Sequence, residues 1–99
     1  MKINTEVLGK TGRFFIEENN NTVAEMDFQL PAEDTLLIVH TEVDEALEGK
    51  GVGRELVQAA VDYARENNLR LKATCSYARK VLDRSPEYAD VYQSEKSKT

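Results

Sequence analysis

The sequence predicts an α+β domain with a mixed sheet, in which an antiparallel β-meander is followed by one βαβ unit and C-terminal helices. Three observations carry this prediction. Residues 1–45 alternate between strand-like segments and turn signals. Residues 52–67 place apolar side chains at three- and four-residue spacing, which is typical of an amphipathic helix. Residues 69–75 return to two-residue alternation. A strand, a helix and a strand of these lengths imply a parallel pair with a right-handed crossover.

Strand-like segments fill the first part of the chain. Residues 13–18 form a short strand between turn signals at 9–12 and 19–21, where Gly and Asn are frequent. Residues 22–30 alternate between apolar and polar side chains, so one face of this strand should be buried. Residues 35–41 contain a continuous apolar run at 36–39, as expected of a central strand covered on both faces. Helices or a ligand are therefore expected on both faces of the sheet.

Helices are expected to dominate the last quarter of the chain. After the strand at 69–75, a helix should run from Ser76 or Tyr77 to about Arg84. Ser85 then resembles an N-cap followed by Pro86 at the first helical position. A short last helix is therefore expected over residues 87–92.

Size, charge and composition exclude several classes of function. The 99 residues fit one domain, expected over 1–92, with a polar tail at 93–99. The net charge of −5 argues against nucleic acid or an anionic membrane surface as the main partner. A single cysteine, Cys75, and a single histidine, His40, exclude a cysteine-based zinc site and a His-rich metal site, and no metal is expected. A single cysteine can form no internal disulfide, and no apolar run is long enough for a signal peptide or a membrane span, so a cytoplasmic protein is expected. A monomer or weak dimer is expected.

Three alternating glycines stand where the strand should give way to the helix, in the sequence EGKGVGR at residues 48–54. Glycine lets a ligand approach the backbone closely. The free N–H groups and the dipole of a helix's first turn favour an anion such as a diphosphate. The P-loop spacing is absent, and the dinucleotide pattern fails because Arg54 stands where its third glycine belongs. The alternative is a turn that only joins strand to helix.

The same segment resembles the Q/R-x-x-G-x-G/A signature of the GNAT acyltransferase superfamily, which binds the pyrophosphate of coenzyme A. The sequence is most similar to a minimal GNAT-like branch of chains as short as this one. Blocks at 40–43, 75–77 and 86–88 (HTEV, CSY and PEY) carry that similarity, which covers about residues 36–92. One position departs from the signature, since Glu48 stands where Gln or Arg is usual. Either Glu48 turns outward, or nearby basic side chains (Lys50, Arg54) supply the positive charge.

The resemblance implies a three-layer α/β GNAT-like fold that binds acetyl-CoA. It implies that the strand around Thr41, Glu42 and Val43 pairs with the pantetheine arm. It also implies that six consecutive residues hold the pyrophosphate: Gly49, Lys50, Gly51, Val52, Gly53 and Arg54. In superfamily members the cofactor thioester lies between two strands that splay apart, which here are the strand at 35–41 and the strand ending at Cys75.

Several side chains are candidates for the chemistry of acetyl transfer. Glu42 is a candidate general base, and His40 shares its strand face and is a candidate proton shuttle; the alternative for both is a structural or solvated residue. Cys75 is either an acyl acceptor or a small core residue. Three tyrosines are candidate proton donors to the leaving thiolate, or simply packing residues: Tyr77, Tyr88 and Tyr92.

Two functions follow from these expectations. The first is an acetyl-CoA-dependent N-acetyltransferase that acts on an unidentified amine acceptor, such as a protein or peptide. The second is a coenzyme-A-binding module with little or no catalytic activity. The second gains support from residues 1–30, which have room only for strands and not for the N-terminal helices that wall the acceptor site in larger superfamily members.

Overall fold

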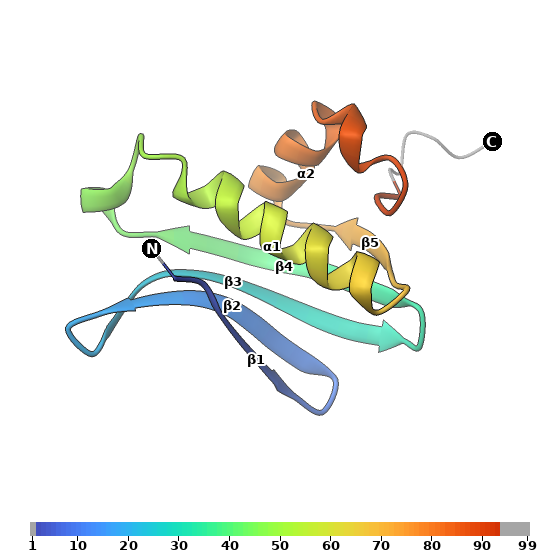
Figure 1. The fold of residues 1–99 in the computed structure, drawn as a ribbon, viewed down its shortest axis with the longest axis horizontal. Coiled ribbons are helices and arrows are strands. Elements are labelled where there is room, and N and C mark those ends of the chain that lie inside the picture. The colour runs from blue at the N-terminus through green and yellow to red at the C-terminus, as the bar shows by residue number, and fades with distance from the viewer. Residues whose placement is uncertain (1, 94–99) are drawn as a thin grey trace.

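Five strands lie in sequence order in a single mixed sheet, and two α-helices pack against it (Figure 1). The computed structural model describes residues 2–93. The strands are β1 (Asn4–Leu8), β2 (Thr11–Glu18), β3 (Asn21–Ala32), β4 (Thr35–Val43) and β5 (Arg70–Ala73). The helices are α1 (Val52–Glu66) and α2 (Ser76–Asp83), with 3₁₀ turns η1 (Glu45–Leu47) and η2 (Pro86–Tyr88). Strands β1 to β4 pair antiparallel and β5 joins β4 in parallel, which confirms the predicted fold class. Residues 94–99 of the expected tail lie outside the described residues.

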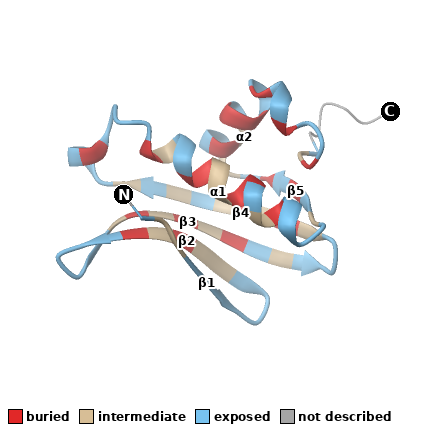
Figure 2. Cartoon of the chain, viewed as in Figure 1, coloured by how far each residue is buried: buried red, intermediate tan, exposed pale blue. Residues whose placement is uncertain are grey.

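One face of the sheet carries the hydrophobic core. Alternate residues of the strands point toward the helices and are buried (Figure 2): Phe14, Ile16, Ala24, Met26, Phe28, Leu36, Ile38, Leu71 and Ala73. Helix α1 presents its apolar stripe to this face. The segment after α2 is tied to α1, because Tyr88 Oη donates to Gln58 Oε1 at 2.6 Å. Both helices therefore lie on the same side of the sheet (Figure 1).

The other face of the sheet is left without a helical layer in the described part of the chain. Leu37 and Val39 are only half-buried there, although residues 35–41 predicted burial on both faces. The crossover helix α1 covers one face, and α2 returns to that same face. A largely antiparallel sheet tolerates one wet face, so the continuous apolar run of β4 did not require a second cover.

A β-bulge interrupts the pairing of β3 with β4. Asp27 pairs with His40 and the next residue, Phe28, pairs with Ile38, so Val39 is an extra residue on β4. A bulge reverses which side chains face the core. As a result His40 and Glu42 lie on the open face, whereas Thr41, opposite the buried Met26, faces the helices.

The end of the described chain differs from the expected helix at 87–92. Only the 3₁₀ turn η2 forms, and the chain then runs alongside β5, where Leu71 N donates to Val91 O at 2.8 Å. Ser85 is buried, and its hydroxyl donates back to the Val81 carbonyl at 2.7 Å instead of capping the next turn. In this segment the backbone hydrogen-bonds to the edge of β5 and does not continue as a helix. Within residues 2–93 no helix is both long and apolar enough to cross a membrane.

Candidate functional site

The glycine turn is built so that its backbone faces open space at the start of α1. Gly49 and Gly51 have φ angles of 81° and 76°, which side chains other than glycine rarely adopt. No atom lies within 4 Å of the position that a Cβ would take at either residue. Gly51 is the N-cap, and the first hydrogen bond into the helix runs from Glu55 N to Gly51 O at 3.1 Å. The N–H groups of residues 52–54 precede that bond and can serve an anion.

A cavity of about 500 Å³ opens at this turn, which is within the usual range for ligand pockets. Its lining contains seven of the nine residues that the resemblance assigned to the cofactor: Thr41, Val43, Gly49, Gly51, Val52, Gly53 and Arg54. Glu42 and Lys50 do not line it. Leu47, Glu48 and Tyr77 do, and sequence reasoning had not placed them there. Lys50 does not line the cavity, so Arg54 is its one basic lining residue among the described residues. The acidic Glu48 lies in the same lining.

Gly53 differs from the other two glycines because a side chain lies against it. A Cβ at this position would lie 2.5 Å from Tyr77 Oη and 2.8 Å from Tyr77 Cζ. The tyrosine from the first turn of α2 therefore packs directly on the first turn of α1. Burial raises the pKa of the Tyr77 hydroxyl, although the positive charge of Arg54 acts in the opposite direction. No signal in the local sequence pairs these two residues, because they come together only when both helices pack on the sheet.

The strands β4 and β5 part at the level of this cavity. Their last register pair is Ile38 with Ala73, and Thr74 N and Cys75 N both approach the Ile38 carbonyl, at 3.0 and 3.3 Å. Strand β4 continues to Val43, so the β5-facing backbone edge of residues 39–43 has no strand partner among the described residues. Cys75 is half-buried at the N-cap of α2 and donates from Sγ to Thr41 Oγ1 at 3.3 Å. It thus joins the two strands where their backbones separate.

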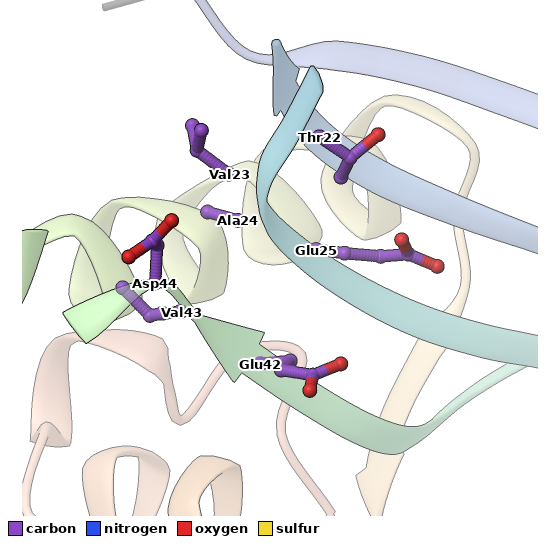
Figure 3. A pocket seen from close by; sticks show the side chains of 7 residues that line it. All are labelled: Thr22, Val23, Ala24, Glu25, Glu42, Val43 and Asp44. Carbon is purple, nitrogen blue, oxygen red and sulfur yellow. The ribbon is translucent and has the colours of Figure 1, made fainter. Parts of the chain in front are cut away.

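The candidate bases lie on the opposite face of the sheet from the cavity. Glu42 is directly opposite Glu25 in the register, and both side chains run in the same direction beside a second hollow of about 310 Å³ (Figure 3). His40 Nε2 is 3.6 Å from Glu42 Oε1. Two carboxylates directly opposite each other on neighbouring strands destabilise a sheet. This arrangement gives the open face a negative field.

Asp27 on β3 lies on the same open face as Glu25 and Glu42, and these three carboxylates form an acidic strip. Burial, followed by the neighbouring Glu25 carboxyl, raises the pKa of Asp27 from 3.8 to about 6, against the opposing charges of His40 and Arg13. Arg13 is itself held by Glu6, at 2.8 Å, and by Glu25, at 3.3 Å. No group of three or more metal-ligating side chains is found among residues 2–93.

The remaining candidate tyrosines have structural partners. Tyr88 donates to Gln58, as described above, and Tyr92 Oη donates to Asp83 Oδ1 at 2.9 Å. Neither lines the cavity at the glycine turn. The structure therefore brings the glycine turn, Thr41, Val43 and Tyr77 together, and places His40 and Glu42 on the far face of β4.

A meander that feeds a parallel βαβ unit, with a glycine turn at the N-terminus of the crossover helix, matches the fold of GCN5-like acetyltransferases. The chain belongs to the GCN5-related N-acetyl-transferase family, whose model matches residues 13–91. Enzymes of this family use acetyl-CoA as the acetyl donor.

Individual relatives agree with this assignment. A GCN5-like protein from Staphylococcus aureus, solved by NMR, is 36% identical, with a TM-score of 0.73 over 92% of this chain and 88% of that one. A ribosomal-protein-alanine N-acetyltransferase from Brucella melitensis has a TM-score of 0.64 over 92% of this chain and 67% of its own, and at 16% identity it shows the fold alone. Protein NATD1 from Xenopus tropicalis is 32% identical over 59 residues, which are 60% of this chain and 54% of that protein. The chain thus spans about half the length of the curated relatives it matches.

Proposed function

We propose that this chain is an acetyl-CoA-dependent N-acetyltransferase that transfers the acetyl group to an amine. The observation that carries the proposal is the cavity at the start of α1, where open backbone at Gly49 and Gly51 meets the free N–H groups of the helix. Such a helix start favours a diphosphate, because its N–H groups and its dipole both attract negative charge. Residues 1–92 would form the single domain that binds it.

The unpaired edge of β4 gives the pantetheine arm a place to bind. Residues 41–43 lie next to the cavity and have backbone groups that β5 does not use. An extended, amide-containing arm can pair with such an edge as an added strand does. In this proposal Thr41 and Val43 face the cavity, and the backbone of Glu42 contributes to the same edge.

Acetyl-CoA supplies an acetyl group activated as a thioester. The chain must orient the amine, accept its proton and hold the carbonyl oxygen as charge develops on it. Glu42 is the proposed base, with His40 at 3.6 Å as a partner that can pass the proton to solvent. Both act from the open face, past the point where β4 and β5 part. The acceptor is proposed to be an amine that reaches this face.

One observation favours the alternative of a coenzyme-A-binding module with little catalysis. The side chains of His40 and Glu42 are 58% and 80% exposed and lie across the sheet from the cavity. Such exposure is usual for charged surface residues, so it does not by itself indicate catalysis. Binding and catalysis therefore need separate tests.

The binding test is an amide NMR titration of the chain with acetyl-CoA, coenzyme A, ATP and NAD in turn. Saturable shifts are expected at residues 49–54 and 41–43 with the two coenzyme A species. ATP and NAD serve as controls that carry phosphates without the pantetheine arm, and should give smaller shifts confined to residues 49–54. Absence of saturable shifts at both segments with acetyl-CoA would overturn the proposal.

The catalytic test is release of the coenzyme A thiol from acetyl-CoA in the presence of a panel of amines. An N-acetyltransferase releases thiol only when a suitable amine is present, with a matching amount of acetylated amine detected by mass spectrometry. Saturable binding without amine-dependent release across small amines, peptides and proteins would select the binding module instead.

A further inference from the structure

We propose that Tyr77 is a cofactor-binding residue whose hydroxyl donates a hydrogen bond to the pyrophosphate of acetyl-CoA at the first turn of α1. The inference rests on the proposed function and adds a donor from α2 to a site otherwise made of the glycine turn. It also reassigns Tyr77 from a candidate proton donor to the thiolate to a residue that holds phosphate.

The position of the ring is the first support. Tyr77 packs so closely on Gly53 that a single Cβ there would overlap its hydroxyl end. Gly53 and Arg54 both belong to the turn whose N–H groups are free, and all three residues line the same cavity. The phenol oxygen is therefore held beside the N–H groups that an anion would use.

The hydroxyl is also available. Tyr77 is 39% exposed, and its hydroxyl makes no hydrogen bond to any other residue in the described range 2–93. The hydroxyl groups of Tyr88 and Tyr92, by contrast, donate to Gln58 and Asp83. A tyrosine hydroxyl keeps its proton at neutral pH, and burial raises the pKa of Tyr77 further, so the phenol remains a donor.

The third support is the charge balance of the cavity. Glu48 stands at the position where the family signature has Gln or Arg, lines the cavity and cannot donate. Lys50 is not in the lining, so Arg54 and Tyr77 are the side-chain donors at this end of the cavity within the described chain. Hydrogen bonds to an ionised phosphate are stronger than neutral ones. One added phenol donor can therefore offset part of the affinity lost because Glu48 replaces a hydrogen-bond donor.

The test compares Tyr77→Phe with the unmodified chain by NMR titration, using acetyl-CoA and S-acetylpantetheine, which lacks the pyrophosphate. The phenylalanine ring keeps the packing on Gly53, so the fold should be retained, as a superimposable amide spectrum away from the site would show. The Kd for acetyl-CoA is expected to rise by roughly 10-fold, the value for one hydrogen bond to a charged group. The Kd for S-acetylpantetheine should stay the same. Tyr92→Phe, which removes a hydroxyl outside the cavity, is the matched control and should change neither.

Two results would overturn the inference. An unchanged Kd for acetyl-CoA with a lowered kcat would show that Tyr77 acts on the leaving group and not on the phosphate. An equal loss of affinity for both ligands would place the hydroxyl on the pantetheine arm. Failure of the unmodified chain to bind acetyl-CoA would be a different result, because it overturns the proposed function and the inference with it.

Discussion

Cys75 Sγ donates a hydrogen bond to Thr41 Oγ1 over 3.3 Å and bridges β4 and the end of β5 where their backbones have stopped pairing. Thr41 points to this side of the sheet only because the bulge at Val39 reverses the alternation of β4. This contact predicts a structural role for the thiol, in which it helps hold the two strands together, as a further alternative to an acyl acceptor or a small core residue. The half-buried position of Cys75 agrees with that role.

Removal of the thiol should cost stability more than turnover. We expect Cys75→Ala to lower the free energy of unfolding by about 1 kcal/mol, the usual net value of one hydrogen bond, as measured by urea denaturation. Thr41→Val removes the acceptor without changing shape, so the double variant should lose less than the sum of the two single losses. In Cys75→Ala, the rate of amine-dependent thiol release should stay within a few-fold of that of the unmodified chain. Loss of all turnover in a folded Cys75→Ala protein would instead favour the acyl-acceptor role.

Gly49 and Gly53 should respond to alanine for different physical reasons. At Gly49 the space is open but φ is 81°, so Gly49→Ala should cost roughly 1–2 kcal/mol of backbone strain. At Gly53 the helical backbone would gain about 1 kcal/mol from alanine, were it not for the tyrosine ring. Gly53→Ala should therefore destabilise the chain while Tyr77 is present.

A matched pair of variants tests whether Tyr77 causes the destabilisation expected for Gly53→Ala. In a Tyr77→Ala background the obstacle is gone, and Gly53→Ala should become neutral or stabilising in urea denaturation. If Gly53→Ala destabilises both backgrounds equally, Tyr77 is not the reason for glycine at this position. Gly49 and Gly51 both have a positive φ, so substitutions at either position combine lost binding with backbone strain.

The acidic strip on the open face predicts a specific pH dependence of stability. Asp27 has a pKa of about 6 in the folded chain and near 3.8 when unfolded, so the folded state binds more protons between these values. Stability from this group therefore falls as pH rises through that window and is lowest above it. Asp27→Asn, which mimics the protonated form, should gain stability relative to the unmodified chain as pH rises from about 4 to about 7.

Urea denaturation of both chains across that range measures the difference, in which the other titrating groups largely cancel. Glu25→Gln should move the upper end of this pH window to lower pH and reduce the total effect of Asp27, because it removes the neighbouring carboxyl that helps raise the pKa of Asp27 in the folded chain. A stability difference between Asp27→Asn and the unmodified chain that does not vary with pH would contradict the raised pKa.

Glu42 provides the sharpest test of catalysis. If it is the base, Glu42→Gln should lower kcat by roughly 10²- to 10⁴-fold, the usual range for general-base catalysis. The Kd for acetyl-CoA should hold, because the side chain does not line the cavity and faces away from it. Glu45→Gln, an exposed neighbour in η1, is the control for a simple change of charge. Equal kcat values in Glu42→Gln and Glu45→Gln would remove Glu42 from the mechanism.

Local patterns in the sequence were sufficient for the order of elements and for the glycine turn. The alternation of residues 22–30 and the stripe of residues 52–67 report directly which side of each element meets the core, because that periodicity is a property of the chain itself. The family resemblance on residues 48–53 likewise needed only consecutive residues. The expectation of a last helix failed because local signals at Ser85 and Pro86 could not register the competing edge of β5.

The sequence by itself thus determined the fold class and the family, and it predicted the segment that would hold a pyrophosphate. Only the tertiary structure decided that His40 and Glu42 lie on the face of β4 opposite the cavity. It also decided that Cys75 contacts Thr41 and that Tyr77 packs on Gly53. The reason is physical. One extra residue in a bulge reverses every side chain beyond it, and contacts between residues more than twenty positions apart depend on how the helices pack on the sheet.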